Sequence, residues 1–255
     1  MNRLSVLTIA FNEEHNITHS LESVRWADEI IVVDSGSTDR TVELAKQYTD
    51  KVFTVSWQGF GATKNFALQH ATADWVLWLD ADERVTEELA KEIQQVIRAG
   101  NRQFAAYNVA RRAFFLGRWI RHCGWYPSRV TRLFRRGKGR FSEMHVHERL
   151  LIDGPVGTLR HDIVHYTDPD LYHYFSKFNR YTSLAAKDLL AAGKSFRLFD
   201  LLFRPPFLFL KMYILRLGFL DGIQGFILCA VSSAYVFTKY AKLWELRGSR
   251  VGKGD

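Results

Sequence analysis

The chain has 255 residues, of which 47% are hydrophobic and 24% charged, a composition typical of one large globular domain or a domain with an appendage. Its N-terminus lacks the long apolar core of a cleavable secretion signal. Its two cysteines, Cys123 and Cys229, exclude a disulfide framework and a cysteine metal site, so we expect a reducing, cytosolic setting. Residues 1–100 hold 9 Lys or Arg and 16 Asp or Glu, whereas residues 101–255 hold 26 and 11. This asymmetry indicates an anionic partner for the second part: nucleic acid, phospholipid or a phosphorylated glycan.

Apolar runs alternate with helical patterns over the first 100 residues. They predict strands over 4–11, 29–36, 51–57 and 75–82, and helices over 13–26, 37–48, 63–71 and 83–97. Such alternation predicts parallel strands in an α/β sheet, where ligands bind beyond the carboxyl ends of the strands. Each predicted strand is followed by polar or glycine-rich residues, which together would form one rim. Any one of these strand ends, taken alone, is also typical of an ordinary capped loop.

The fourth predicted strand ends in a pair of acids within "WVLWLDADERV", residues 75–85. On a strand, Asp80 and Asp82 would point to the same face because side chains alternate with a period of two. Two adjacent carboxylates suit a divalent cation such as Mg²⁺ or Mn²⁺, which prefers oxygen ligands. The alternative is a solvated turn in which Glu83 opens a polar helix.

The second part of the chain is first basic and then apolar. Residues 101–142 hold eleven Lys or Arg and no acid, with aromatic residues interleaved. Arginine forks bind phosphates and aromatic faces stack on sugar rings, although single-stranded nucleic acid would suit the same composition. Further on, the charge-free run 222–238 has 17 residues, at the lower limit for a membrane-spanning helix. With Pro205–Pro206 and several glycines, the region predicts short helices in the membrane interface, or alternatively a buried helical cap.

Several motifs carry a family resemblance. "VLTIAFNEEHNI", "IIVVDSGSTDRT", "GFGATKNFAL" and "WVLWLDADERV", in this order, resemble the catalytic domain of family-two glycosyltransferases. "LGRWIRHCGWYPSRVTRLFRRGKGRF", "HVHERL" and "LRLGFLDGIQGFI" are similar to the lipopolysaccharide-core β-glucosyltransferases of Gram-negative bacteria, over nearly the whole chain. The resemblance implies a GT-A mixed sheet flanked by helices over residues 1–170, with a donor half (1–100) and an acceptor half (101–170). It also implies a C-terminal helical, membrane-associated region over 171–255.

The resemblance further implies an inverting, metal-dependent hexosyltransferase that uses a UDP-sugar, with glucose the expected sugar. The family pattern has two adjacent acids after the second strand, but Ser35 takes the second place here, so only Asp34 is carried over. The positions that match nucleotide-sugar binding are Ala10, Asn12, Glu13, Asp34, Lys64 and Asp80.

For the divalent cation, Asp82 and His147 are the expected ligands, in a site that neutralises the departing diphosphate. His145 is the alternative ligand, and both histidines also fit a structural role. Inversion needs a base for the acceptor hydroxyl; we expect Glu148, with Glu143 second. Alternatively, Glu148 pairs with a nearby arginine. Expected acceptor-binding residues are Arg121, Trp125, Tyr126 and Arg129.

Taken together, the sequence predicts a peripheral enzyme at the cytoplasmic face of the bacterial inner membrane. It would move the sugar to an anionic glycolipid such as the lipopolysaccharide inner core, without binding nucleic acid. Within the same class, the alternative acceptor is a polyprenyl phosphate or a capsule intermediate. The alternative of another class is a basic nucleic-acid-binding protein.

Overall fold

The computed structural model describes residues 2–100, 103–142 and 149–251, in two compact units. The sheet unit comprises Met1–Arg112 and Ser128–Tyr166, and the helical unit comprises Ala113–Pro127 and Thr167–Asp255. Residues 113–127 thus group with the C-terminal helices, whereas the sequence expectation kept them inside a domain over 1–170. That expected domain division stays a prediction. The two units are described separately below.

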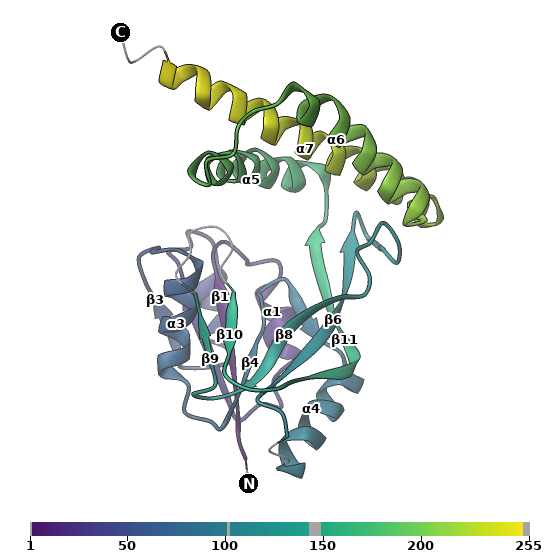
Figure 1. The fold of residues 1–255 in the computed structure, drawn as a ribbon. Helices are drawn as coiled ribbons and strands as arrows, with labels where there is room; N and C mark the ends of the chain where they lie inside the picture. The colour runs from purple at the N-terminus through teal and green to yellow at the C-terminus, as the bar shows by residue number, and fades with distance from the viewer. Residues whose placement is uncertain (1, 101–102, 143–148, 252–255) are drawn as a thin grey trace. The chain divides into compact units, whose positions relative to one another are not determined.

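The amino-terminal half of the sheet unit is parallel (Figure 1). Three of its strands are mostly apolar and buried, as expected where both faces of a sheet are covered, whereas the edge strand over 52–54 is partly exposed. In register, Ala10 lies opposite Asp34, Asp34 opposite Thr54, and Leu7 opposite Trp78. The carboxyl ends therefore meet at one edge, which confirms the predicted common rim. The strands, in spatial order, are β3 (Val52–Thr54), β2 (Glu29–Asp34), β1 (Leu4–Ala10) and β4 (Trp75–Trp78).

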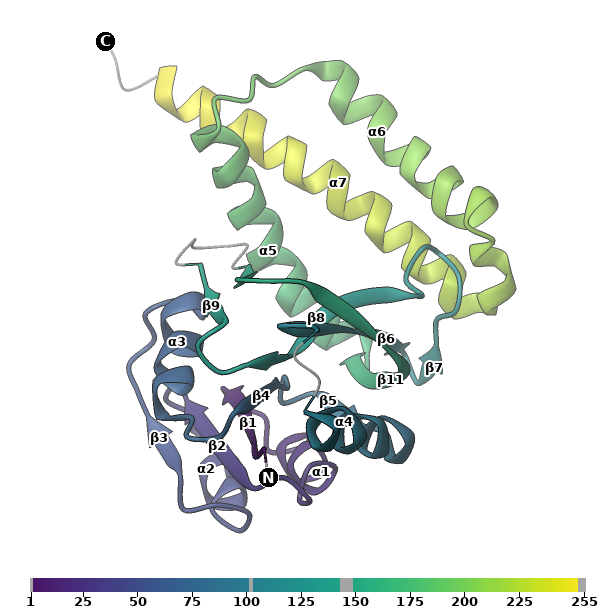
Figure 2. The same ribbon diagram turned by 60° about the horizontal axis from the view of Figure 1, so that its bottom comes forward.

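The sheet continues beyond β4 with antiparallel pairs, so it is mixed, as the resemblance implied (Figure 2). β8 (Ser128–Arg135) runs antiparallel to both β4 and β6 (Ala106–Phe115). β11 (Val156–Asp168) follows, and then β5 (Glu83–Val85), which runs antiparallel to it. A separate hairpin joins β9 (Gly139–Phe141) to β10 (Leu150–Ile152).

Helices flank this sheet over two hydrophobic clusters, because successive residues of a strand such as Val6 and Leu7 point to opposite faces. Two helices are shorter than predicted because polar residues before them form hydrogen-bonded turns. In one such turn, the Asn16 N–H donates to the Glu13 carbonyl at 2.9 Å. The helices are α1 (Ile17–Glu22), α2 (Thr41–Ala45), α3 (Phe60–His70) and α4 (Glu87–Ala99).

Two expectations around the acid pair are wrong. β4 ends at Trp78, so Asp80 and Asp82 lie in the turn between β4 and β5 and do not share a strand face. Glu83 does not open a helix, because residues 83–85 pair with β11. The helix begins only after Thr86, whose side chain accepts a hydrogen bond from the Leu89 N–H at 3.2 Å and caps α4.

The helical unit contains α5 (Leu171–Ala191), α6 (Leu198–Leu210), the π-helical turn η1 (Lys211–Leu215), the 3₁₀ turn η2 (Gly218–Asp221) and α7 (Gly222–Val251). The expected break into short helices is wrong, since α6 continues through Pro205 and Pro206 and α7 has 30 residues. The Ser233 hydroxyl of α7 donates to the Pro205 carbonyl at 2.8 Å. By length and composition, 218–248 is the one described helical stretch apolar enough to cross a membrane, with mean hydropathy 1.4.

Candidate active site

The first part of the candidate site is the loop after β1. Ala10 is buried, and its carbonyl accepts from the Ser35 N–H at 2.9 Å. Asn12 has a φ of +55°, a left-handed conformation that asparagine tolerates better than most residues. Its side-chain oxygen accepts from the Thr38 N–H at 2.9 Å, and the Glu13 N–H donates to the Thr41 hydroxyl at 2.7 Å. Ala10, Asn12 and Glu13 are thus fixed against the loop after β2.

Asp34 ends β2 at the same edge and is 1% exposed. One of its carboxylate oxygens accepts from the N–H groups of Gly36 and Ser37, both at 2.9 Å. The other accepts from the Ser37 hydroxyl. Asp34 therefore fixes the turn at residues 35–37, which faces the loop that contains Asn12. Its oxygens can still accept a further hydrogen bond.

Asp80, two residues beyond β4, is held as a carboxylate by three neighbours. Its Oδ1 accepts from Trp78 Nε1–H at 2.9 Å, and its Oδ2 forms an ion pair with Arg132 Nη2. Burial acts to raise the pKa of Asp80, but the charges of Arg132 and Lys64 and these hydrogen bonds outweigh it. They hold that pKa well below its usual range, so the group is ionised at neutral pH.

Arg132 also bonds the third acid of the motif. Its Nη2 lies 2.5 Å from Glu83 Oε1, and Glu83 Oε2 accepts from the Asp80 N–H at 3.1 Å. The Arg132 side chain is 8% exposed and the Glu83 side chain 0%. Burial raises the pKa of Glu83 and Asp80 adds to that rise, while Arg132 opposes it. One buried guanidinium thus fixes the turn from inside. Arg132 belongs to the basic run 101–142, for which the sequence indicates an anionic partner, but its guanidinium pairs with these buried acids.

Asp82 faces a different partner, His165 of β11. The distance from Asp82 Oδ2 to His165 Nε2 is 3.2 Å, and both side chains are slightly exposed. Burial acts to lower the pKa of His165, but the hydrogen bond and charge of Asp82 outweigh it and raise that pKa. The main chains are joined as well, since the Tyr166 N–H donates to the Asp82 carbonyl at 2.9 Å.

Lys64 projects from α3 and is 7% exposed. Its ammonium nitrogen lies 4.7 Å from the Trp78 ring centroid and 5.4 Å from that of Phe141, within cation–π range. Asn65 fixes Phe141 by donating to its carbonyl and accepting from its N–H, each at 2.9 Å. Lys64 therefore brings a positive charge toward Asp80, as the pKa of that group reflects.

The expected base and several expected ligands lie outside the described residues. These are Glu148, Glu143, His147 and His145. The residues on either side of them are described: the Ser142 N–H donates to the Arg149 carbonyl at 2.9 Å, directly after the Phe141 that contacts Lys64. Ser142 and Arg149, the described residues next to them, are therefore hydrogen-bonded to each other beside Phe141.

The expected acceptor-binding residues fall in different units. Arg129 is an exposed residue of β8 in the sheet unit, whereas Arg121, Trp125 and Tyr126 belong to the helical unit. There, the Arg121 guanidinium lies 4.2 Å from the Trp119 ring centroid, and Trp119 meets Tyr126 edge to face at 5.4 Å. Trp125 packs on Phe115 at 6.2 Å, in a small apolar core. Arg121 and Tyr126 thus share an aromatic neighbour, Trp119, which is one of the aromatic residues interleaved in the basic run.

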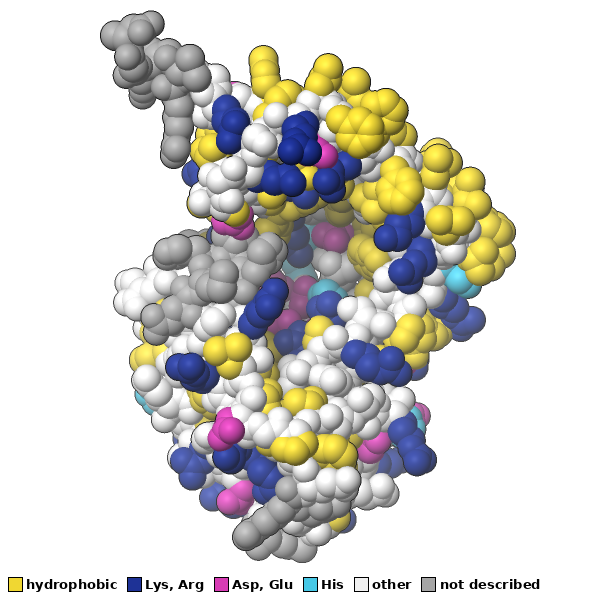
Figure 3. Space-filling view, viewed as in Figure 1, with side chains coloured by type: hydrophobic (Ala, Val, Ile, Leu, Met, Phe, Trp, Pro, Cys, Tyr) yellow, Lys and Arg dark blue, Asp and Glu magenta, His cyan; other side chains and the backbone are white. Residues whose placement is uncertain are grey.

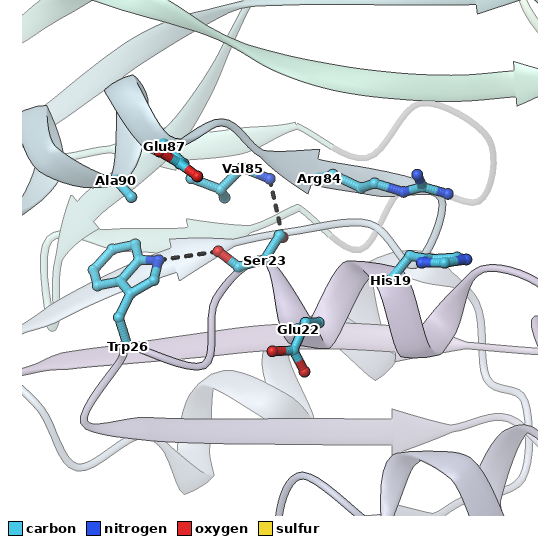
Figure 4. Close-up of a pocket in the computed structure, with 8 residues that line it drawn as sticks. All are labelled: His19, Glu22, Ser23, Trp26, Arg84, Val85, Glu87 and Ala90. Carbon is cyan, nitrogen blue, oxygen red and sulfur yellow. Dashed lines mark hydrogen bonds between the residues drawn. The ribbon is translucent and has the colours of Figure 1, made fainter.

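A surface pocket of about 380 Å³ in the sheet unit lies between α1, β5 and α4 (Figure 4). Ser23 links its walls by accepting from the Val85 N–H at 3.0 Å with its hydroxyl and from Trp26 Nε1–H at 3.0 Å with its carbonyl. None of the predicted site residues lines it.

A divalent cation fits the donor set of the rim. Asp82 offers a carboxylate oxygen and His165 an imidazole nitrogen, both ligands for Mn²⁺ and, for the carboxylate, Mg²⁺. Among the residues that the structure describes, no group of three or more His, Cys, Asp or Glu side chains is placed to hold a metal. Two protein ligands nevertheless suffice when substrate phosphates complete the coordination, as is usual for Mg²⁺.

Comparisons with known proteins agree with this geometry. Residues 5–154 match the family described as Glycosyl transferase family 2. The chain is 32% identical over 254 residues to the lipopolysaccharide core biosynthesis glycosyltransferase LpsC of Rhizobium meliloti (strain 1021), covering 95% of this chain and 92% of that one. It is 31% identical over 257 residues to an uncharacterized glycosyltransferase of Rickettsia typhi, covering 96% and 88% of the two chains.

Among solved structures, the mannosyltransferase PcManGT from Pyrobaculum calidifontis, determined in complex with GDP-Man and Mn²⁺, is similar in fold. The TM-score is 0.57 at 16% identity, over 95% of this chain and 87% of that one. The parallel strands with a polar rim, the mixed sheet and the sequence match lead to one conclusion: this chain belongs to glycosyl transferase family 2 and has the GT-A fold.

Proposed function

We propose that this protein transfers a sugar from a nucleotide diphosphate to an anionic glycolipid of the membrane, with inversion at the anomeric carbon. The observation that carries the proposal is the Asp82–His165 pair at the carboxyl edge of a family-two sheet, beside the ionised Asp80 and the buried Lys64. The rim combines negative ligands for a cation with a positive side chain for phosphate.

In this proposal, the loops after β1 and β2 bind the nucleoside through Ala10, Asn12, Glu13 and Asp34. These loops are already fixed to each other by hydrogen bonds, so little ordering is needed when the donor binds. Lys64 stabilises the diphosphate, and Asp80, whose Oδ2 is engaged by Arg132, keeps the shape of the turn and accepts from sugar or ribose hydroxyls.

Asp82 and His165 would hold Mg²⁺ or Mn²⁺, with His147 as a further candidate ligand. The cation, when bound, neutralises the charge that develops on the departing diphosphate. His165 takes part as the neutral imidazole, because a protonated ring has no lone pair for a metal. His165 Nε2 lies 3.2 Å from Asp82 Oδ2, so a proton on Nε2 would leave to solvent when these two side chains hold the cation.

For the displacement, we propose Glu148 as the base, with Glu143 as the second candidate. The acceptor hydroxyl oxygen bonds to the anomeric carbon as the bond from that carbon to the diphosphate oxygen breaks. The base takes the hydroxyl proton, and attack from the face opposite the leaving group inverts the configuration. The position of Ser142 and Arg149, the described residues that flank both candidates in the chain, directly after the Phe141 that contacts Lys64 supports this assignment.

For the acceptor, the name of the Rhizobium meliloti relative supports the lipopolysaccharide core. We propose that Arg121, Trp125, Tyr126 and Arg129 contact it, and that the enzyme works at the cytoplasmic face of the inner membrane. UDP-glucose is the proposed donor. A polyprenyl phosphate acceptor is the second candidate, since it shares the phosphate and the lipid tail.

The test is a transfer assay with the full-length protein, Mn²⁺ or Mg²⁺, and labelled UDP-glucose, UDP-N-acetylglucosamine and GDP-mannose as separate donors. Acceptors are inner-core glycolipid and a polyprenyl phosphate in matched micelles. The proposal expects label in the inner-core glycolipid, from UDP-glucose above the other donors. Label in the polyprenyl product alone would select the second acceptor, and no transfer from any donor to either acceptor would contradict the proposed function.

A further inference from the structure

The helical unit exposes a largely apolar surface, which we call the apolar hairpin: residues 198–226, comprising α6, η1, η2 and the start of α7, with Arg204, Lys211 and Arg216 also exposed. Phe199, Phe203 and Phe207 recur every four residues along one face of α6, and all three are more than half exposed. At the turn, Leu215 is 72% exposed. Figure 3 shows hydrophobic side chains gathered over this part of the molecule. Soluble monomers rarely expose so large an apolar patch, which indicates a binding surface.

Basic side chains stand beside the turn of the hairpin. We call Arg118, Arg121 and Arg216 the arginine group. A Cβ on Gly222 would lie 3.3 Å from Arg118 Nη1, and one on Gly124 would lie 3.7 Å from Arg216 Nη1, so these guanidinium groups adjoin the turn. Within the described part of the chain, no carboxylate lies within ion-pair distance of any of the three. Their charge is therefore available to an anionic partner.

Hydrogen bonds join the arginine group to the hairpin. The Asp221 carboxylate is buried and accepts from the Arg121 N–H at 3.2 Å and the His122 N–H at 2.8 Å, and His122 Nδ1 lies 3.0 Å away. The Cys123 N–H donates to the Arg216 carbonyl at 3.0 Å. The loop 116–127, which carries Arg121, Trp125 and Tyr126 of the proposed acceptor residues, is therefore fixed to the apolar hairpin.

The opposite side of the helical unit, formed by α5, carries polar and charged side chains beside exposed aromatic ones such as Tyr172 and Phe175. Figure 2 draws α7 between α6 and α5. Lys242 of α7 donates to the Asn179 side chain and to the hydroxyls of Thr182 and Ser183, at 2.7–2.9 Å. α5 also exposes Arg180 and Lys187 to solvent. One face of α7 is thus covered by a helix that keeps charged side chains in water.

We propose that the apolar hairpin enters one leaflet of an anionic phospholipid bilayer and lies in its plane, so that α7 does not cross the membrane. A spanning α7 would draw α5 and its charged side chains into the hydrocarbon, where each charge is costly. Lying in the plane buries the phenylalanines, keeps α5 in water and brings the arginine group to lipid phosphates. This inference rests on the proposed membrane-bound acceptor and names the surface that reaches it.

The first test is sedimentation of the full-length protein with vesicles, which requires no sugar transfer. Phe199→Ser/Phe207→Ser removes two side chains that are 64% and 63% exposed, and Tyr172→Ser/Phe175→Ser is the matched control on α5, with 85% and 49%. The hairpin variant should bind phosphatidylglycerol-containing vesicles about tenfold more weakly or worse, and the control should bind like the wild type. Equal binding by the hairpin variant, or an equal loss in the control, would overturn the assigned surface.

The arginine group has its own comparison. Arg118→Gln/Arg216→Gln should abolish most of the preference for phosphatidylglycerol vesicles over phosphatidylcholine vesicles and flatten the salt dependence. Arg180→Gln/Lys187→Gln, which removes two charges from α5, should leave that preference unchanged. The same loss in both double variants would show a general charge effect and refute the role of the arginine group.

Depth measurement separates lying in the plane from spanning, and it requires no loss-of-binding variant. Nitroxide labels at Phe199→Cys, Phe207→Cys and Leu215→Cys report depth through collision with oxygen and a water-soluble relaxant; the two native cysteines are buried. We expect one similar, shallow depth for all three. A steady change of depth from 199 to 215 through the bilayer midplane would contradict the proposal. If sugar transfer is observed together with such a steady change of depth, the proposed function stands and only the in-plane position of the hairpin is overturned.

Discussion

Arg132→Met tests whether the buried Arg132 stabilises the turn that contains Asp80 and Glu83. The guanidinium it removes neutralises Glu83 and Asp80, and the side chains of Arg132 and Glu83 are 8% and 0% exposed. Breaking a buried ion pair by removing one partner costs about 3–5 kcal/mol, because the other charge stays without water or a counter-ion. Asp80 is partly exposed and keeps its Trp78 hydrogen bond, so it adds little. We therefore expect a loss near the lower end, about 3 kcal/mol in the free energy of unfolding.

The assay is urea unfolding of the full chain in mild detergent, followed by tryptophan fluorescence and circular dichroism. Glu83→Gln in the Arg132→Met background should recover about 2 kcal/mol, because the uncompensated charge is gone while the amide oxygen still accepts from the Asp80 N–H. Arg129→Met, on the same strand at an exposed position, is the control and should change stability by less than about 0.5 kcal/mol. An Arg132→Met protein as stable as this control, or a double variant weaker than the single one, would refute the buried-pair reasoning.

Two further predictions concern other parts of the chain. Burial acts to raise the pKa of Glu29, but Lys51 and three hydrogen bonds outweigh it and lower that pKa from 4.5 to about 2. The ionised group therefore stabilises the folded state above pH 4.5, and this stability is lost as the pH falls toward 2. Glu29→Gln should remove up to about 3 kcal/mol of unfolding free energy at pH 7 and flatten its decline below pH 4.5, measured by urea titration across pH; an unchanged slope would count against it. Gly225→Ala should disrupt the packing of η2 on α7, since its Cβ would lie 2.1 Å from the Gly218 carbonyl oxygen, whereas Gly248→Ala on the same helix meets nothing within 4 Å. Thermal unfolding in detergent should show a lower midpoint temperature for Gly225→Ala than for the wild type, and no lowering for Gly248→Ala. Equal midpoints for the two variants would contradict the close approach.

The parallel half of the sheet and its rim could be predicted from the sequence because they depend on local patterns. Each strand is an apolar run ended by polar residues, and parallel strands bring those ends to one edge, as the pairing of Ala10 with Asp34 confirms. The predicted start of the helix at Glu83 was wrong because of a contact with a distant part of the chain. Residues 83–85 are a strand only because β11, some eighty residues later, pairs with them.

The partners of the acids could not be predicted for the same reason. Arg132 lies in a run of arginines, and nothing in that run marks the one that becomes buried when β8 joins β4 antiparallel. His165 reaches Asp82 only through the pairing of β11 with β5. The apolar residues of 156–168 do not alternate strictly, so the local pattern predicts neither this strand nor its neighbour. Glu148 stays a prediction, since it lies outside the described residues.

The family assignment also decides between the two broad classes that the charge asymmetry left open. A basic second half suits nucleic acid as well as a phosphorylated lipid. The match of residues 5–154 to glycosyl transferase family 2 places the chain among sugar transferases instead. Within the helical unit, charge and apolar surface occur together at the turn of the hairpin, which is the combination expected for a lipid partner.

The central claim is that Asp82 and His165 support sugar transfer by holding a divalent cation. The most direct measurement compares initial rates of transfer to inner-core glycolipid for the wild type, Asp82→Asn, His165→Ala and His161→Ala. His161 lies on the same strand and contacts Glu92 at 2.9 Å, so its variant controls for loss of a histidine–carboxylate pair. The account predicts at least a hundredfold loss for Asp82→Asn, a clear loss for His165→Ala, little change for His161→Ala, and no wild-type transfer in EDTA until Mn²⁺ or Mg²⁺ is restored. Full transfer in EDTA, or an Asp82→Asn enzyme as fast as the His161→Ala control, would contradict it.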